Sequence, residues 1–99
     1  LFDNKIDISN TTPITTASFK KDAEIVLFSK SKLKSVSVRV LGNYYLADPV
    51  GNNKHKVLFP DIKRAGKYLA DVFEGDNLID QVEFEIKREI GKIEDSDWF

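Results

Sequence analysis

Hydrophobic and polar residues alternate along much of the chain, which is the period-2 pattern of strands with one buried face. The clearest example is residues 35–41, where Val36, Val38 and Val40 alternate with small or charged residues. The same alternation in residues 79–87 predicts the last strand of the chain. No helical period of 3.6 residues persists over a long window, so the pattern predicts an all-β domain.

Turn signals divide the rest of the chain into further short strands. Pro13 interrupts the first strand, as is typical of an edge strand that changes its pairing partner. Residues 48–53, with one Pro, one Gly and two Asn, give the strongest loop signal, and residues 62–65 are expected to form a single helical turn. A helix over residues 23–34 is the alternative to a strand there, although the β-branched and aromatic content favours a strand. The remaining strands are expected at residues 5–8, 14–18, 23–29, 44–47, 55–59 and 67–74.

The alternation also predicts which side chains enter the core. The residues that alternate with the expected core residues point outward, and they are charged or small, as a solvated sheet face requires. They are Ser37, Arg39, Asp71, Glu83 and Glu85. Partner contacts are therefore expected from loops or from the tail rather than from a strand face. The expected core comprises Val36, Val38, Val40, Tyr68, Ala70, Val72, Val82, Phe84 and Ile86.

Four segments follow, in order, the pattern of strands B, C, E and F of an intermediate-type immunoglobulin-like domain: residues 22–29, 38–42, 57–62 and 65–70. The resemblance implies an immunoglobulin-like β-sandwich of about seven to eight antiparallel strands. A fibronectin-type module and another seven-stranded sandwich are the alternatives.

The sequence Ala-Gly-Lys-Tyr-Leu-Ala, which contains Gly66 and Tyr68, resembles the corner between strands E and F. The resemblance implies a structural role for both residues, with the Tyr68 hydroxyl bonded to an upstream backbone group. Three positions depart from the family pattern. Ser29 and Ala70 stand where the family has its cysteines, and Val38 stands where it usually has tryptophan. The chain contains no cysteine, so no disulfide forms.

Composition narrows the function classes. The 99 residues suffice for one domain, expected at residues 1–87, followed by an acidic tail at residues 88–99. The net charge of −1 argues against general nucleic-acid binding, which needs a basic excess. No apolar run approaches the roughly 20 residues of a membrane span. Because the chain starts at Leu1 and contains no methionine, we expect a domain cut from a longer protein or a processed product.

Residue types that carry chemistry are sparse. His55 is the single histidine and is expected on a partly exposed strand position. A metal site needs several ligands, and a catalytic triad needs a nucleophile beside a histidine. The sequence contains neither pattern. Glu83 and Glu85 alternate with apolar residues on one strand, which indicates a solvated face rather than a paired-acid site. We therefore expect no catalytic residue, no metal and no cofactor.

Aromatic residues are the candidate partner contacts. Tyr44 and Tyr45 beside the turn at residues 42–43 either form a contact surface for a sugar or protein, or divide into one core ring and one exposed ring. Trp98 and Phe99 end the tail, and a free Trp usually contacts something because its burial is favourable by about 2–3 kcal/mol. The other interpretation is that the tail is loosely ordered in the isolated domain.

Disulfide-free immunoglobulin-like domains such as this one resemble the domains found on capsid decoration proteins of tailed bacteriophages. The resemblance implies a non-enzymatic module displayed on the virion surface and bound to capsid proteins through a segment outside this chain. It also implies a weak surface attachment to a host glycan or protein, with a monomer as the isolated state. The alternatives are a carbohydrate- or host-surface-binding domain of a bacterial surface protein, and an inert accessory domain of a hydrolase.

Overall fold

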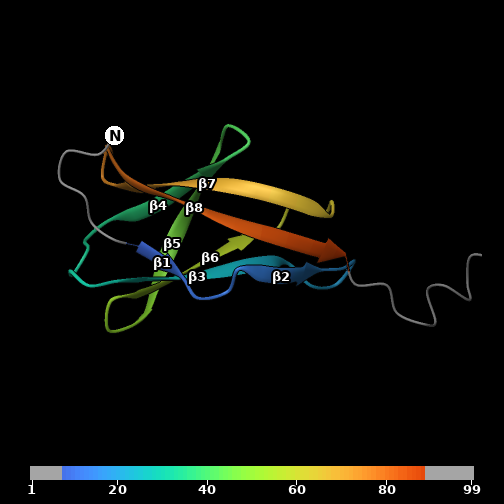
Figure 1. Ribbon diagram of the computed structural model, residues 1–99, viewed down its shortest axis with the longest axis horizontal. Helices are drawn as coiled ribbons and strands as arrows, with labels where there is room; N and C mark the ends of the chain where they lie inside the picture. Colours follow the sequence, from blue (N-terminus) through green and yellow to red (C-terminus); the bar gives the residue numbers. More distant parts are fainter. Residues whose placement is uncertain (1–7, 89–99) are drawn as a thin grey trace, which may run out of the picture.

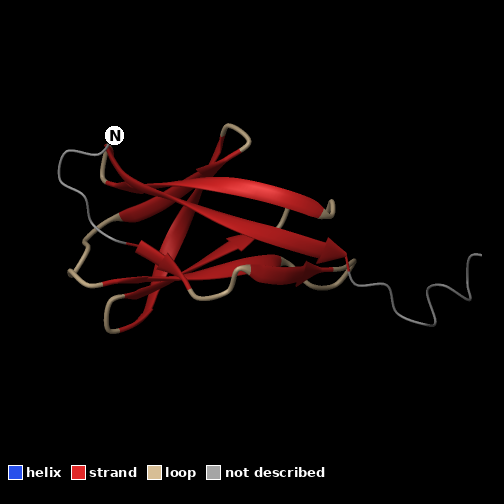
Figure 2. Ribbon diagram, in the orientation of Figure 1, coloured by secondary structure: helices blue, strands red, loops and turns tan. Residues whose placement is uncertain are grey.

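A computed structural model of the chain describes residues 8–88, and every regular element within them is a strand (Figures 1 and 2). None of the described residues therefore forms a helix that could cross a membrane. The strands are β1 (Ile8–Asn10), β2 (Ile14–Ala17), β3 (Ala23–Ser29), β4 (Val36–Val40), β5 (Asn43–Gly51), β6 (Lys54–Phe59), β7 (Gly66–Glu74) and β8 (Asn77–Arg88).

The eight strands form one curled sheet in the order β1-β3-β6-β5-β4-β7-β8-β2. All neighbours are antiparallel except β2 and β8, which are parallel. The order matches the A-B-E-D and C-F-G groups of an immunoglobulin-like sandwich, with β1, β3, β6 and β5 in the first group and β4, β7 and β8 in the second. The all-β prediction and the strand number are confirmed. The two groups are joined, however, because the long strand β5 pairs with β6 on one side and with β4 on the other.

The first strand breaks and changes partner, as Pro13 predicted. β1 pairs with β3, whereas β2 lies beside β8 at the other end of the sheet order. Between them the chain crosses from one half of the sheet to the other, and threonine hydroxyls tie it to β3. The Thr12 hydroxyl accepts a bond from the Val26 amide at 2.8 Å, and the Thr15 hydroxyl accepts one from the Glu24 amide at 3.1 Å. We call this line of contact, which joins Thr12 of the β1–β2 connection and Thr15 of β2 to β3, the threonine seam.

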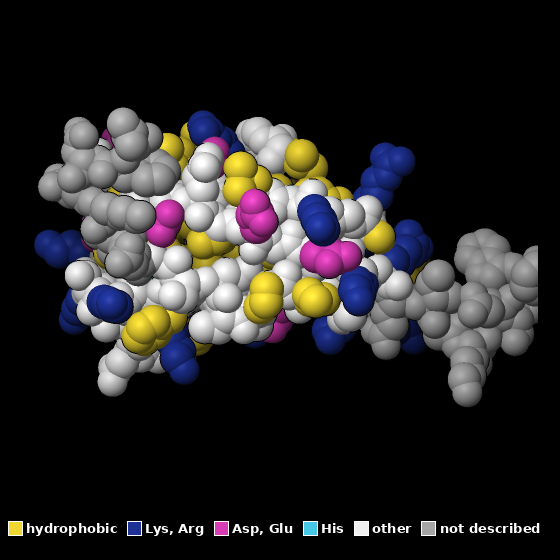
Figure 3. All heavy atoms as spheres, in the orientation of Figure 1, with side chains coloured by type: hydrophobic (Ala, Val, Ile, Leu, Met, Phe, Trp, Pro, Cys, Tyr) yellow, Lys and Arg dark blue, Asp and Glu magenta, His cyan; other side chains and the backbone are white. Residues whose placement is uncertain are grey.

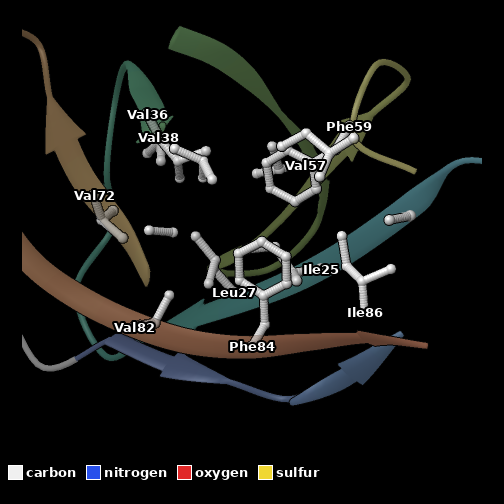
Figure 4. Close-up of a cluster of buried hydrophobic side chains, with 14 of the residues drawn as sticks. Ile25, Leu27, Val36, Val38, Val57, Phe59, Val72, Val82, Phe84 and Ile86 are labelled. Carbon is white, nitrogen blue, oxygen red and sulfur yellow. The ribbon is translucent and has the colours of Figure 1, made fainter. Parts of the chain in front are cut away.

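The core fills the space inside the curl, with side chains from both halves pointing toward one another (Figure 4). Eight of the nine expected core residues are buried, and Tyr68 is partly buried against them. Phe84 stacks on Phe59 with ring centroids 5.1 Å apart and on Tyr68 at 5.5 Å. Tyr45 meets Phe59 edge-on at 4.9 Å. These four rings form what we call the inner aromatic cluster.

Two local predictions are wrong. Residues 48–53 are not a loop, because β5 continues to Gly51 through a register shift after Pro49, and only Asn52 and Asn53 form the turn. Proline is tolerated at such an irregularity because the ladder there needs no donor from it. Residues 62–65 do not form a helical turn. Ile62 instead buries its side chain in the core, with its amide bonded to the Phe59 carbonyl at 3.3 Å.

His55 is also placed differently from the prediction. Its side chain points to the core side of β6 and is only 7% exposed. The two-residue alternation explains this, since Val57 and Phe59 lie on the same face and are fully buried.

Candidate binding surface

Tyr44 and Tyr45 lie on opposite faces of β5, because successive residues of a strand alternate. Tyr45 belongs to the inner aromatic cluster, and its hydroxyl donates a hydrogen bond to Asp61 Oδ1 at 2.8 Å. Burial, together with this bond to a carboxylate, raises the pKa of Tyr45 to about 12. Tyr44 is 63% exposed on the outer face. The two rings thus divide into one core residue and one surface residue.

A tight turn at Leu41 and Gly42 places Tyr44 in its surroundings. Both residues have positive φ, 53° and 81°, which is the signature of a type I′ turn between β4 and β5. Positive φ is uncommon for a bulky residue such as leucine. The turn sets a register in which Arg39 lies opposite Tyr44.

Arg39 is held in place by its neighbours on both sides. Its Nη2 and Nε atoms donate to Asp71 Oδ2 at 2.7 and 3.2 Å, and its Nη1 lies 3.4 Å from the Tyr44 hydroxyl. The bond to Asp71, and then that to Tyr44, raises the pKa of Arg39. Burial alone would raise the pKa of Asp71, but hydrogen bonds from Arg39 and Gln81 outweigh it and lower that pKa below its usual range. Gln81 Nε2 donates to Asp71 Oδ1 at 2.6 Å.

Aromatic rings flank the guanidinium. Arg39 Cζ lies 5.2 Å from the Phe73 ring centroid and 5.8 Å from that of Tyr44. The two rings lie 5.7 Å apart in a tilted arrangement. Such cation–π contacts restrict the arginine further.

Exposed leucines extend this arrangement. Leu46 follows Tyr44 on the same face of β5 and is 81% exposed, and Leu69 lies on the outer face of β7, two residues before Asp71. Together the outward side chains of β4, β5 and β7 form a patch that we call the Arg39 face, made of Arg39, Tyr44, Leu46, Leu69, Asp71 and Phe73.

A shallow groove of about 450 Å³ adjoins the Arg39 face at Leu69. It runs over β7, β8 and the start of β2, and its outer walls combine Pro13 and Ile14 with Lys67, Glu83 and Glu85. Figure 3 shows the same mixture over these strands, with hydrophobic side chains in separate spots between acidic and basic ones. The groove is therefore amphipathic rather than apolar.

The corner residues lie at the start of β7. The Tyr68 hydroxyl donates a hydrogen bond to the Arg64 carbonyl at 2.6 Å, while its ring packs on Phe84. Gly66 has a φ of 154°, where a side chain is disfavoured. At the cysteine positions of the family pattern, Ser29 and Ala70 are both buried, and the Ser29 hydroxyl bonds to the Ser31 carbonyl at 2.6 Å. Trp98 and Phe99 lie outside the described residues.

The view that outward positions are charged or small is wrong for three members of the Arg39 face, so this strand face is not excluded from partner contacts on that ground. Leu69 and Phe73 alternate with the buried residues of β7, so their outward direction could have been inferred from the sequence. Leu46 could have been inferred in the same way from Tyr45 and Ala47, which face the core. The pairing of Arg39 with Tyr44 carried no such signal, because it depends on the turn.

Comparison with known proteins places the chain in a family. A family model described as Domain of unknown function (DUF7862) matches residues 6–89. The chain belongs to the DUF7862 family. The match includes all eight strands of the DUF7862 domain. No curated protein and no solved structure matches the chain.

Groups of three or more potential metal ligands do not occur within residues 8–88 of this DUF7862 domain. Two of its carboxylates have other roles: Asp71 pairs with Arg39 on the outer face, and Asp80 Oδ2 accepts a bond from the Ile8 amide at 2.9 Å. The Arg39 face thus presents one fixed cation, one exposed phenol and exposed aliphatic side chains.

Proposed function

We propose that this domain is a non-enzymatic binding module that contacts a protein surface through the Arg39 face. The observation that carries the proposal is the exposed Tyr44 ring beside an arginine already fixed by Asp71 and two rings. Tyrosine and arginine dominate the binding energy of protein interfaces. Because Arg39 and Tyr44 are already positioned by their neighbours, their binding to a partner would cost little side-chain entropy.

The biological setting that we propose is the surface of a tailed-bacteriophage capsid. The support for it is the resemblance of the chain, roughly from Lys5 to Lys87, to an immunoglobulin-like domain without a disulfide, a kind of domain that resembles those of capsid decoration proteins. In this setting another segment of a longer protein binds the capsid, and the present domain projects outward with the Arg39 face available to a host-surface protein.

Particles that carry the full-length parent protein provide the test. Wild-type particles are compared with Tyr44→Ala particles for copies of the protein per capsid and for adsorption to host cells. Phe19→Ala is the matched control, because Phe19 is an 85% exposed aromatic residue in the β2–β3 connection, away from the Arg39 face. We expect unchanged copy number in all three, with adsorption reduced at least about fivefold by Tyr44→Ala alone.

Two results would refute parts of the proposal. A parent protein that never copurifies with particles would remove the capsid setting. Adsorption that falls with Phe19→Ala but not with Tyr44→Ala would move the contact from the sheet face to a loop.

Carbohydrate binding is the second candidate, and the exposed Tyr44 ring also favours it, because an aromatic face beside hydrogen-bonding groups suits a sugar. A glycan array at millimolar concentration separates the two proposals. Binding that Tyr44→Ala abolishes would favour the sugar, and signals at background level would leave the protein partner.

A further inference from the structure

A second concave site lies at the end of the molecule where the β5–β6 turn meets the β3–β4 connection. It has a volume of about 180 Å³, which corresponds to roughly six waters at their share of liquid volume. The side chains that define it are Lys32, Leu33, Pro49, Asn52, Asn53 and His55. Pro49 is separated from Tyr44 by four residues of β5, and none of these side chains belongs to the Arg39 face.

His55 is the unusual member of this pocket. The residue is only 7% exposed, and across the two ladders it lies opposite Leu27 of β3 and Pro49 of β5, neither of which offers a side-chain polar group. Within residues 8–88 no fully buried side-chain nitrogen or oxygen lacks a partner, and no described residue hydrogen-bonds to the imidazole. His55 lines the pocket, and a buried ring nitrogen needs a hydrogen-bond partner, which a ligand in the pocket can supply.

The other polar groups of the pocket can each donate a hydrogen bond. Lys32 is exposed at its rim and is its one charged side chain among the described residues. The Asn53 backbone carbonyl is already used by the Ser29 amide at 3.0 Å, and its side-chain amide donates to the Lys30 carbonyl at 3.3 Å. The Asn52 side chain, the imidazole and the ammonium group remain, and within residues 8–88 no carboxylate lines the pocket to compete for them.

Apolar walls complete the site. Leu33 is buried, and Pro49 presents its ring beside His55. A charged contact within such walls is stronger than one in open solvent, because the local dielectric constant is lower. The pocket thus combines one cation, one imidazole and one amide around a volume of a few waters.

We propose that this pocket binds a small oxyanion, either the carboxylate of an acidic sugar or a phosphate group. In the bound state His55 donates a ring N–H to one oxygen, and the Lys32 ammonium neutralises the charge. Leu33 and Pro49 contact the uncharged part of the ligand. The site is independent of the Arg39 face, so the failure of either proposal leaves the other standing.

The single histidine makes the test direct, because its ring C–H signals in an NMR spectrum need no assignment by mutation. The domain is titrated at constant pH and ionic strength with sodium phosphate, with glucuronate and with glucose. We expect saturable shifts of the His55 ring signals and of the Asn52 and Asn53 amides with the two anions, at millimolar dissociation constants. Glucose, which has the ring but no charge, should cause none.

Lys32→Gln and Lys34→Gln are the matched pair of variants. Both lysines are exposed in the same β3–β4 connection, and both changes remove one positive charge, but Lys34 does not line the pocket. We expect Lys32→Gln to weaken anion binding about tenfold, the loss of one charge-assisted contact. Lys34→Gln should leave binding within about twofold of wild type. Because both positions are exposed, neither variant endangers folding.

The relative strength of the two anions identifies the source of the oxyanion. Tighter glucuronate points to an acidic sugar, and tighter phosphate points to a phosphate group. Equal weakening by the two lysine variants, glucose binding as strong as glucuronate, or shifts that do not saturate below about 50 mM would overturn the proposal, since each removes recognition of charge by this pocket.

Discussion

The domain has two groups of aromatic rings on opposite sides of the same strands. The inner aromatic cluster joins Tyr45, Phe59, Tyr68 and Phe84 inside the curl, and each of its two hydroxyls has an acceptor. The outer pair, Tyr44 and Phe73, brackets a guanidinium and is covered on one side only. Both groups are ordered by contacts, yet only the outer one leaves an aromatic surface for another molecule.

This difference shows that the position of an aromatic residue on a strand, and not its type, decides whether its ring stabilises the core or stays available for binding. Tyr44 and Tyr45 are neighbours in sequence, but the alternation of a strand sends one outward and the other into the core. Phe59 and Phe84 are almost completely buried, and Tyr45 and Tyr68 are partly buried against them, so the inner rings stabilise the fold. The outer rings keep their exposed faces, and we infer that their remaining apolar area is available for binding.

The largest expected effect comes from truncating one ring of each group, which tests whether the inner rings stabilise the fold more than the outer rings do. Phe84→Ala should lower the free energy of unfolding by about 3–5 kcal/mol, because it removes a ring that is 2% exposed and stacked on two others. Phe73→Ala, on the half-buried outer ring, should cost no more than about 1–2 kcal/mol. Urea unfolding curves measure both, and similar losses for the two variants would erase the distinction.

Removal of single hydroxyls tests the same division more finely. Tyr68→Phe should lower the free energy of unfolding by about 1–2 kcal/mol, since the Arg64 carbonyl loses its 2.6 Å bond. Tyr44→Phe should change it by less than about 0.5 kcal/mol, because the Tyr44 hydroxyl is exposed and its distance to Arg39 is 3.4 Å. An unchanged urea midpoint for Tyr68→Phe would show that the corner bond contributes nothing.

The turn that sets the outer pair should be improvable. Leu41→Asn is expected to raise the free energy of unfolding by about 0.5–1 kcal/mol, since asparagine tolerates the positive φ that leucine adopts there. Leu41→Ala is the control, because alanine removes the exposed side chain but keeps the unfavourable backbone conformation. Thermal melts distinguish them, and an equal gain with alanine would mean that the backbone is not the cause.

The smallest expected effect concerns the ion pair beneath the outer rings. The pKa of Asp71 is lower in the folded protein than its ordinary value of about 3.9, so the ion pair stabilises the fold above that pH. The contribution disappears as the pH falls through the lowered pKa. Because the pair is partly exposed, we expect only about 0.5 kcal/mol.

Wild type is therefore compared with Asp71→Asn in urea at pH 7 and at about pH 2.5. The difference in the free energy of unfolding should be present at neutral pH and shrink toward zero in acid. Asp76→Asn, in the exposed β7–β8 turn, is the control. A difference that grows as the pH falls would have the wrong sign and would refute the assignment.

The strands were predictable because a two-residue period can be seen in a single sequence. Val36, Val38 and Val40 show it without interruption, and the structure buries all three. The change of partner near Pro13 was predictable for a related reason, since proline lacks the donor that a continued ladder needs. Both are local properties of the chain.

The register of β4 and β5 could not be predicted from the sequence. The pairing of Arg39 with Tyr44 in the Arg39 face, which depends on that register, could not be predicted either. A turn at residues 42–43, as expected from Gly42 and Asn43, would place Arg39 opposite Leu46. The actual turn begins one residue earlier, and Arg39 lies opposite Tyr44. Its first residue, Leu41, is a residue type that sequence rules exclude from positive φ, so only the three-dimensional context accounts for it.

The threonine seam determines where the curled sheet can first come apart. The amides of Val26 and Glu24 bond to side-chain hydroxyls, so rotation of two threonines releases them without disturbing any backbone ladder. Local opening requires less free energy where fewer cooperative bonds must break. Among the hydrogen-bonded amides of the strands, proton exchange with solvent should therefore begin at these two amides of β3, and the β7–β8 pair, with the longest ladder, should exchange last.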